Sequence, residues 1–194
     1  MGEAIRQSFT SPSDYLNREE TASYKSEYRA GEVIAMSGGT INHNTISGNI
    51  FALLRDRTRG KGCRPFNSDM KLNISAHHTF VYPDAMVICG DIVRLENRQD
   101  VVCNPVLIVE VLSQSTQNYD RAEKFIKYQS LPSFREYLMV DSQSCRVDTI
   151  FKRNPQEWQM LVYQDLSQSL HLQSLDISLT LEEIYEDVIW DGDA

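Results

Sequence analysis

Two segments of the chain are apolar at almost every position, which is typical of strands inside a covered sheet. Residues 80–89 (FVYPDAMVIC) and 105–112 (PVLIVEVL) would place apolar side chains on both faces of an extended strand. Residues 70–74 alternate apolar and polar positions and predict a half-buried strand. Further short strands are expected at 24–36, around a turn at Ala30-Gly31, and at 136–140, 145–152 and 157–163.

Helical spacing and end signals predict four helices between these strands. They are expected from Ser11 to about Ala22, after Thr40 up to Gly60 or Gly62, from about Thr116 to Ser130, and briefly after Thr180, where Thr180 and Glu183 match a capping box. The order of elements predicts an α/β or α+β fold with a mixed central β-sheet flanked by helices. We expect one domain over residues 1–194, with residues 1–10 as a loose tail.

Composition changes this picture little, but charge bears on function. Apolar residues make up 41% and charged residues 24%, as in ordinary globular proteins. The formal net charge of -8 counts against a protein that coats DNA, because such binding rests on neutralising phosphates. A basic stretch at 55–61 could contact DNA, and its alternative interpretation is a solvated helix end.

Cysteine spacing and the absence of apolar targeting segments indicate a cytoplasmic protein. The four cysteines form no C-x-x-C pair, and the histidines do not extend them into zinc spacing. The N-terminus lacks the apolar core of a signal peptide, and no apolar run approaches membrane-spanning length. We therefore expect no membrane association and four free thiols in a reducing compartment.

Each of the two apolar segments carries one carboxylate, Asp84 or Glu110. Alternation places Glu110 on the same strand face as Ile108 and Leu112. An unpaired carboxylate is costly there, so each acid needs a cation, strong donors or protonation. Two such acids on neighbouring strands would form an oxygen-ligand pair for a divalent cation such as Mg²⁺. The alternative is that each acid caps a strand end or pairs with a buried Arg or Lys.

Short motifs accompany the two acids along most of the chain. They are EYRAGE (27–32), SGGT (37–40), NH (42–43), SDM (68–70), YPD (82–84), EVLSQST (110–116), DRAEK (120–124), Tyr128 and EY (136–137). In this order and spacing they resemble the PD-(D/E)XK nuclease superfamily, and more closely the bacterial Uma-two family of restriction-endonuclease-like proteins. The resemblance implies a restriction-endonuclease-like fold, a homodimer, hydrolysis of DNA phosphodiester bonds, and Mg²⁺ or Mn²⁺ bound at Asp84, Glu110 and Val111.

One position departs from the superfamily pattern. Leu112 stands two residues after the second acid, where the superfamily has a lysine. The resemblance places this lysine on the following helix, at Lys124, where its charge would stabilise or orient the attacking hydroxide. A helical wheel instead puts Lys124 opposite the arc of Phe125 and Ile126, which predicts a solvated pair with Asp120. Both interpretations stay open at this point.

Other residues are candidates for supporting roles. The resemblance implies a catalytic role for Glu27, as a contact to metal or water, and for His43, as a contact to phosphate or water. The alternatives are a surface acid near a turn and a helix cap or packing residue. Ser113 and Gln114 would line the cleft, and Lys71 is a second candidate for the catalytic lysine.

Three functions follow from these residues. The first is a metal-dependent DNA endonuclease with its lysine displaced to the helix. The second is a catalytically degenerate module that keeps the nuclease fold and binds a partner without cleaving, which Leu112 and the acidic net charge favour. The third is a metal-dependent hydrolase of another phosphate ester.

Overall fold

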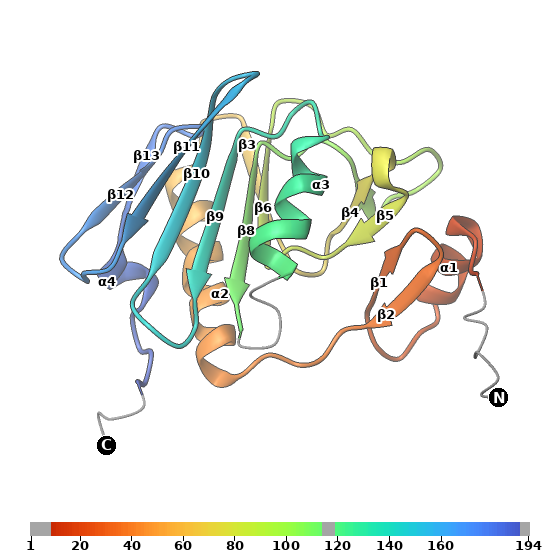
Figure 1. The fold of residues 1–194 in the computed structure, drawn as a ribbon, viewed down its shortest axis with the longest axis horizontal. Coiled ribbons are helices and arrows are strands. Elements are labelled where there is room, and N and C mark those ends of the chain that lie inside the picture. Colours follow the sequence, from red (N-terminus) through yellow and green to blue (C-terminus); the bar gives the residue numbers. More distant parts are fainter. Residues whose placement is uncertain (1–8, 114–118, 191–194) are drawn as a thin grey trace, which may run out of the picture.

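The structure of the protein, a computed structural model, describes residues 9–113 and 119–190 and contains two larger sheets and one hairpin (Figure 1). The five-stranded sheet has the order β2 (Glu32–Ala35), β1 (Ser26–Arg29), β5 (Thr79–Val81), β4 (Lys71–Ile74) and β7 (Val101–Val102). The six-stranded sheet has the order β11 (Glu157–Tyr163), β10 (Val147–Asn154), β9 (Glu136–Asp141), β8 (Leu107–Leu112), β6 (Ala85–Cys89) and β3 (Cys63–Asn67). The hairpin is formed by β12 (Ser169–Leu172) and β13 (Ile177–Thr180).

Helices flank these sheets, as the sequence predicted. They are α1 (Pro12–Glu19), α2 (Ile41–Arg57), a 3₁₀ turn (Ser75–His77), a π-helix (Tyr119–Lys124) that continues into α3 (Phe125–Gln129), and α4 (Leu181–Ile184). Strand pairing is mixed, because β8–β9 and β4–β7 are parallel while the other pairs are antiparallel. The predicted α+β architecture is confirmed. Among the described residues, no helix has both the length and the apolar character that crossing a bilayer requires.

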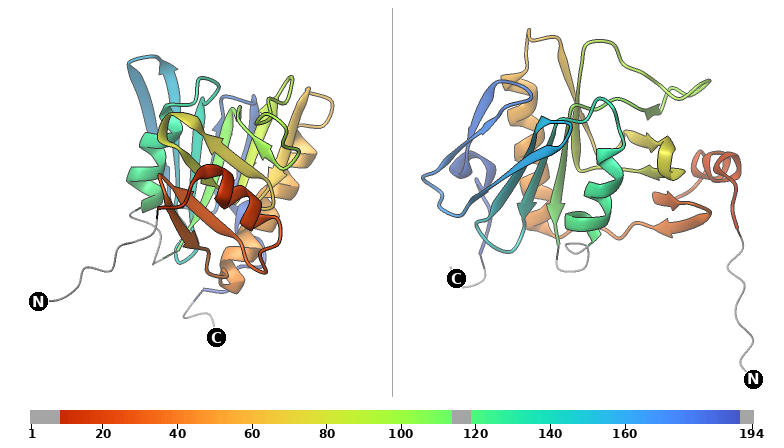
Figure 2. Two further views of the ribbon diagram at one scale, coloured as in Figure 1. Left: turned by 90° about the vertical axis from the view of Figure 1, so that its right-hand side faces the viewer. Right: turned by 45° about the horizontal axis from the view of Figure 1, so that its top comes forward.

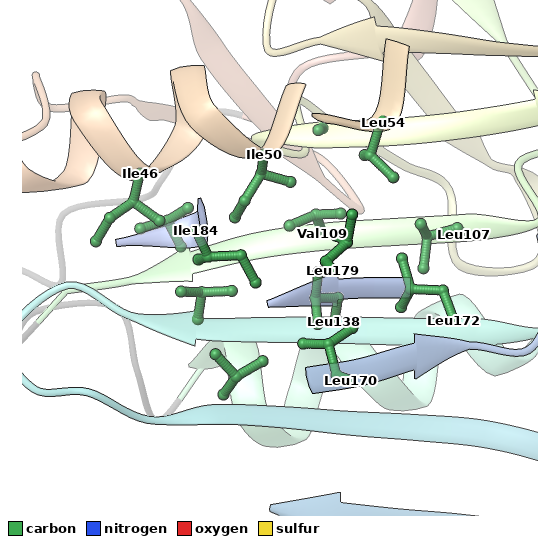
Figure 3. Close-up of a cluster of buried hydrophobic side chains, with 14 of the residues drawn as sticks. Ile46, Ile50, Leu54, Leu107, Val109, Leu138, Leu170, Leu172, Leu179 and Ile184 are labelled. Atoms are coloured by element: carbon green, nitrogen blue, oxygen red, sulfur yellow. The ribbon is translucent and has the colours of Figure 1, made fainter. Parts of the chain in front are cut away.

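Strand β8 is covered on both faces, which explains its apolar sequence. On one face, Val109 belongs to a core cluster with Ile46 and Ile50 of α2 and with residues of β12, β13 and α4 (Figure 3). On the other face, Ile108 packs in a second cluster with Tyr128, Phe134 and residues of the five-stranded sheet. The six-stranded sheet is therefore the middle layer of the molecule.

A smaller cluster joins α1 to the hairpin of β1 and β2. It contains Tyr15, Tyr28, Phe80 and Val101, and it packs α1 on the five-stranded sheet. Figure 2 shows α1, β1 and β2 grouped at the end of the molecule away from β12 and β13. Of the expected N-terminal tail, residues 1–8 lie outside the described residues.

The expected single strand over residues 80–89 is two strands in two sheets. β5 ends at Val81 and β6 begins at Ala85. Pro83 lies in the break, where it cannot donate a backbone hydrogen bond to a ladder. Asp84 consequently occupies the junction between the two sheets and is only partly buried, rather than lying inside a continuous strand. The prediction of one strand is wrong, and Pro83 was the signal against it.

Helix ends follow the sequence signals more closely. Thr40 caps α2 by accepting a hydrogen bond from the backbone N–H of His43, and α2 buries Ile46, Ile50 and Leu54. Thr180 and Glu183 form the predicted capping box at α4. The third helix is described only from Tyr119, so its expected beginning near Thr116 lies outside the described residues.

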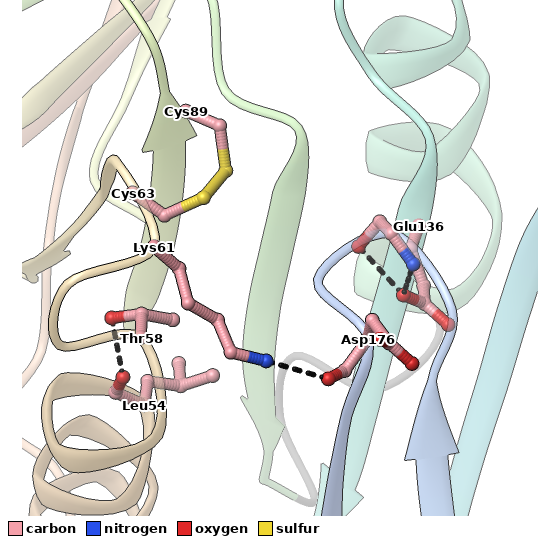
Figure 4. The surroundings of a disulfide bond; sticks show 8 residues. Leu54, Thr58, Lys61, Cys63, Cys89, Glu136 and Asp176 are labelled. Carbon is pink, nitrogen blue, oxygen red and sulfur yellow. Dashed lines mark hydrogen bonds between the residues drawn. A yellow bond between two sulfur atoms is a disulfide. The ribbon is translucent and has the colours of Figure 1, made fainter.

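Cys63 and Cys89 form a disulfide between β3 and β6 (Figure 4). The antiparallel register places the two residues directly opposite each other. Because the N–H of Gly90 bonds to the carbonyl of Gly62, Cys63 and Cys89 form a non-hydrogen-bonded pair, in which facing side chains are closest. The prediction of four free thiols is wrong for this pair, and only Cys103 and Cys145 are free.

Candidate active site

Glu110 extends from β8 toward the helix that follows it in the chain. Glu110 is 3% exposed and lies on the same strand face as Ile108 and Leu112, as alternation predicted. Lys124 Nζ donates to Glu110 Oε1 at 3.1 Å, and Tyr128 Oη donates to the same oxygen at 2.6 Å. The buried carboxylate is therefore held by one charged and one neutral donor from a single helical segment.

Glu27 approaches the same lysine from the other large sheet. It lies on β1, is 4% exposed, and places Oε1 3.3 Å from Lys124 Nζ. Its Oε2 accepts hydrogen bonds from Arg29 Nε at 3.1 Å and Arg29 Nη2 at 2.6 Å. Lys124 thus joins one acid of the five-stranded sheet to one acid of the six-stranded sheet.

The burial of Lys124 contradicts the helical-wheel prediction. Lys124 is 7% exposed, whereas Ile126, which the wheel placed in the buried arc, is 60% exposed. The reason is that residues 119–124 form a π-helix, in which each residue turns through a smaller angle than the 100° assumed. The structure describes the backbone of Asp120, the predicted solvated partner, but not its side chain.

Asp84 contacts the peptide group that follows Glu110. The backbone N–H of Val111 donates to Asp84 Oδ2 at 2.7 Å. His43 Nε2 lies 3.4 Å from Asp84 Oδ1, and both side chains are mostly buried. The ring of His43 thus extends from the first turn of α2 to the Asp84 carboxylate, in addition to the backbone contact of His43 with the cap residue Thr40.

One cavity of about 290 Å³ brings these groups together. Its lining includes the five predicted catalytic residues and Val111, which are Glu27, His43, Asp84, Glu110, Val111 and Lys124. Arg29 and Ser113 also line it, as does the segment from Ile34 to Thr40. Gln114, predicted beside Ser113, lies outside the described residues.

The structure also shows where Leu112 and Lys71 lie. Leu112, which stands where the superfamily has a lysine, is 1% exposed and packs in the core. Lys71 is directed elsewhere: its Nζ lies 5.4 Å from the ring centre of Tyr15, 5.5 Å from that of Tyr82 and 3.5 Å from Asp100. Burial lowers the pKa of Lys71. It does not line the cavity, so Lys124 is the lysine that the fold brings to the acids.

The basic stretch at 55–61 makes contacts typical of a helix end. Arg57 bonds to Asp56 and Glu183, and Lys61 donates to the backbone carbonyl of Asp176 (Figure 4). These contacts join α2 to α4 and to the β12–β13 hairpin. They favour the structural interpretation of this stretch.

The oxygen atoms of the cavity suit a hard divalent cation. Within residues 9–113 and 119–190, no three His, Cys, Asp or Glu side chains converge as a ready metal cluster. Magnesium does not require one, because it usually takes one or two protein carboxylates and keeps several waters. Asp84 and Glu110 both line the cavity, and Asp84 accepts a hydrogen bond from the backbone N–H of Val111, the residue after Glu110. The residues present fit Mg²⁺ or Mn²⁺.

Two contacts of the site were not assigned roles from the sequence, namely those of Tyr128 and Arg29. Tyr128 stands four residues after Lys124, and helical spacing is the signal that could have paired them on one face. Burial, followed by the charge of Glu110, raises the pKa of Tyr128 well above its usual value, so the hydroxyl stays protonated as a donor. Arg29 follows Glu27 by two residues on the same face of β1, which strand alternation predicts.

Comparisons with known proteins agree with this architecture. Residues 12–182 match the model of the Uma2 family, described as "Putative restriction endonuclease". An uncharacterized protein of Synechocystis sp., slr1290, is 37% identical over 175 residues, which are 90% of this chain and 90% of that protein. A second uncharacterized Synechocystis protein, sll1609, is 39% identical over 145 residues, or 75% of this chain and 82% of that protein.

A solved structure shares the fold. The crystal structure of a protein from Anabaena variabilis, titled a putative nuclease belonging to DUF820, superposes with a TM-score of 0.74 at 15% identity. The superposition covers 93% of this chain and 99% of that one. The family match spans both large sheets and every residue of the cavity named above. The chain belongs to the Uma2 family and has a nuclease-like, restriction-endonuclease-like fold.

Proposed function

We propose that this protein is a metal-dependent endonuclease that hydrolyses phosphodiester bonds of DNA. Family membership and the nuclease-like fold support the class of reaction. The observation that carries the proposal is that Asp84 of the β5–β6 junction, Glu110 of β8 and Lys124 of the π-helix line one cavity. This combination of two carboxylates and an ammonium group suits attack of water on a phosphate ester.

In the proposed site, the carboxylates of Asp84 and Glu110 would hold Mg²⁺ or Mn²⁺. The side chain of Val111 has no ligand atom, so Val111 could contribute only its backbone carbonyl oxygen. When bound, the cation supplies charge neutralisation on the phosphate and activation of the attacking water. The hydrogen bond from the backbone N–H of Val111 to Asp84 ties this carboxylate to the residue next to Glu110, which supports the proposed pair.

Lys124 is the fixed cation of the proposed mechanism. Glu27 and Glu110 hold its ammonium group at the cavity wall, so little rearrangement is needed when negative charge develops on the reacting oxygens. Glu27 then acts through Lys124, because both of its oxygens contact cations. His43 contacts Asp84 through Nε2 and orients that carboxylate, and water, from the α2 side.

The proposed reaction is hydrolysis of a phosphodiester bond. The oxygen of water forms a bond to phosphorus while the bond from phosphorus to one ester oxygen breaks. The proton released by the water balances the proton taken up by the leaving oxygen. The products are a terminal phosphate monoester and a hydroxyl group.

DNA is the proposed substrate although the chain is acidic overall. The net charge of -8 is unfavourable for phosphate binding at long range. The cavity lining sets the two cations Arg29 and Lys124 against the three carboxylates of Glu27, Asp84 and Glu110. A bound divalent cation would reverse this balance, so affinity for DNA would depend on the metal. The homodimer stays a prediction, which light scattering of the purified protein measures.

The test is cleavage of plasmid DNA and of an RNA oligonucleotide with Mn²⁺ or Mg²⁺, and with chelator instead. We expect metal-dependent cleavage of DNA that falls at least about 100-fold in Asp84→Asn and Glu110→Gln. Glu136→Gln is the matched control. Glu136 is an equally buried acid on β9, bonded to Gln173 and Ser174 and not part of the cavity lining.

Other outcomes separate the alternatives. Cleavage that survives both substitutions would contradict the site. Binding of Mn²⁺ without cleavage of DNA or RNA, but with turnover of a small phosphate ester, would indicate the third function. The absence of both metal binding and cleavage would indicate the degenerate binding module that buried Leu112 favours.

A further inference from the structure

The hydroxyl of Tyr128 lies deep in the protein and donates to a carboxylate of the cavity. Tyr128 has no measurable exposure, and its Oη lies 2.6 Å from Glu110 Oε1. Tyr128 is not among the residues that line the cavity. The side chain of Tyr128 therefore contacts Glu110 from the hydrophobic core and not from the cavity. A carboxylate on that side would otherwise be poorly solvated.

The ring of Tyr128 is held by the aromatic residues around it. Its centroid lies 5.8 Å from that of Phe134 and 5.6 Å from that of Tyr137, and the contact with Tyr137 is edge-to-face. The ring belongs to the core cluster between the six-stranded sheet and the five-stranded sheet. Its hydroxyl consequently has a fixed position relative to β8.

Lys124 and Tyr128 act on the same oxygen from successive turns of one helical segment. Both contact Oε1 of Glu110, at 3.1 Å and 2.6 Å. Two donors on one carboxylate oxygen restrict rotation of the planar group. The two donors, Lys124 and Tyr128, then determine the direction in which Oε2 of Glu110 points, although the Glu110 side chain is itself flexible.

We propose that Tyr128 is a positioning residue of the site, which fixes the orientation of the Glu110 carboxylate before metal and substrate bind. The proposal rests on the proposed function in one respect, since it assigns Glu110 to the metal. Partners of ligating carboxylates usually change metal affinity by about 10- to 100-fold when removed. Tyr128 therefore adds a residue outside the cavity to the determinants of metal affinity.

The test compares wild type with Tyr128→Phe in two measurements. We expect the crystal structure of the variant to retain the ring positions of Phe134 and Tyr137 and to show a reoriented Glu110 carboxylate. Calorimetric titration with Mn²⁺ alone should give a Kd about 10- to 100-fold weaker. Tyr185→Phe is the matched control, because Tyr185 is also buried and its hydroxyl donates to the backbone carbonyl of Arg146 at 2.8 Å, in the other core cluster.

The outcomes are distinct. An unmoved Glu110 carboxylate in Tyr128→Phe, or an unchanged Kd for Mn²⁺, would overturn the proposal. Equal weakening of Mn²⁺ binding by Tyr185→Phe would also overturn it, because loss of any buried hydroxyl would then suffice. A wild-type protein that binds no Mn²⁺ contradicts the proposed function instead, and the orientation of Glu110 in the two crystal structures then decides the role of Tyr128.

Discussion

Nδ1 of His43 lies 2.7 Å from the position that a Cβ atom would take at Gly39. No carbon atom of a side chain fits at that distance, so residue 39 must be glycine for the ring to stay where it is. The ring is the one that contacts Asp84. The glycine thus determines the place of a candidate catalytic residue without touching the carboxylate.

We predict that Gly39→Ala displaces His43 and lowers DNA cleavage on the order of 10- to 100-fold, because small displacements of positioned groups have large effects on rate. The ring can turn away from the new methyl group, so the free energy of unfolding should change little. Cleavage rates and urea denaturation measure the two effects.

Gly48→Ala is the control for this prediction. A Cβ at residue 48 meets nothing within 4 Å, and Gly48 is exposed on α2 and does not line the cavity. Gly48→Ala should therefore cleave as wild type does, while alanine in the helix raises the free energy of unfolding by about 1 kcal/mol. Equal cleavage by the two variants would show that the place of the His43 ring does not matter for activity.

Removal of the Lys124 ammonium group should destabilise the protein. Lys124→Met takes away the cation shared by the buried acids Glu27 and Glu110. Breaking a buried ion pair in this way costs about 3–5 kcal/mol of unfolding free energy. Urea denaturation measures it, and the double variant Lys124→Met, Glu27→Gln should recover part of the loss. A change below about 1 kcal/mol in the single variant would mean that the acids do not need the lysine.

The disulfide should contribute to stability as well. It links residues 26 positions apart, and closing a loop of this size in the unfolded chain is worth about 3.5 kcal/mol. We expect the double variant Cys63→Ser, Cys89→Ser to lose that amount in urea denaturation, and reductant to bring wild type to the same value. Replacing the free Cys103 and Cys145 with serine is the control. Titration of four thiols in the unreduced, unfolded protein would contradict the disulfide.

The capping box at α4 predicts a loss of stability in acid. The backbone N–H of Thr180, aided by Arg57, lowers the pKa of Glu183 below its usual value of 4.5. A lowered folded-state pKa gives stability that is fully present above the usual value and is lost as the pH falls through the folded value. Glu183→Gln should therefore show a flatter dependence of unfolding free energy on pH, measured from about pH 6 to about pH 3. Glu182→Gln, at the exposed neighbouring acid, should retain the wild-type slope.

Local patterns were sufficient where the structure is decided by neighbours in the chain. The two-sided apolar run of β8 predicted a covered strand and the face on which Glu110 lies. Helical spacing predicted the buried side of α2, and the caps at Thr40 and Thr180 have their expected partners. These features depend on periodicity and on hydrogen bonds between residues a few positions apart.

The remaining features depend on pairing over long distances or on irregular backbone. The disulfide required the register of β3 against β6, which no local pattern fixes. The environment of Glu27 required the meeting of two sheets. Lys124 was misplaced by a wheel that assumed a regular α-helix, whereas the π-helix turns the lysine inward. The family resemblance, which does not depend on helix geometry, named Lys124 as the catalytic lysine. Lys124 lines the cavity, and its catalytic role stays a prediction.

The meeting of two sheets at Lys124 has a consequence for the synthesis of the chain. Glu27 leaves the ribosome long before the lysine that neutralises it, and β1 also waits for β5, its partner at Tyr28 and Phe80. Until residue 124 has emerged, burying Glu27 would leave its charge without this cation. We therefore expect the β1–β2 hairpin to dock on β5 and bury Glu27 only after the six-stranded sheet has begun to form.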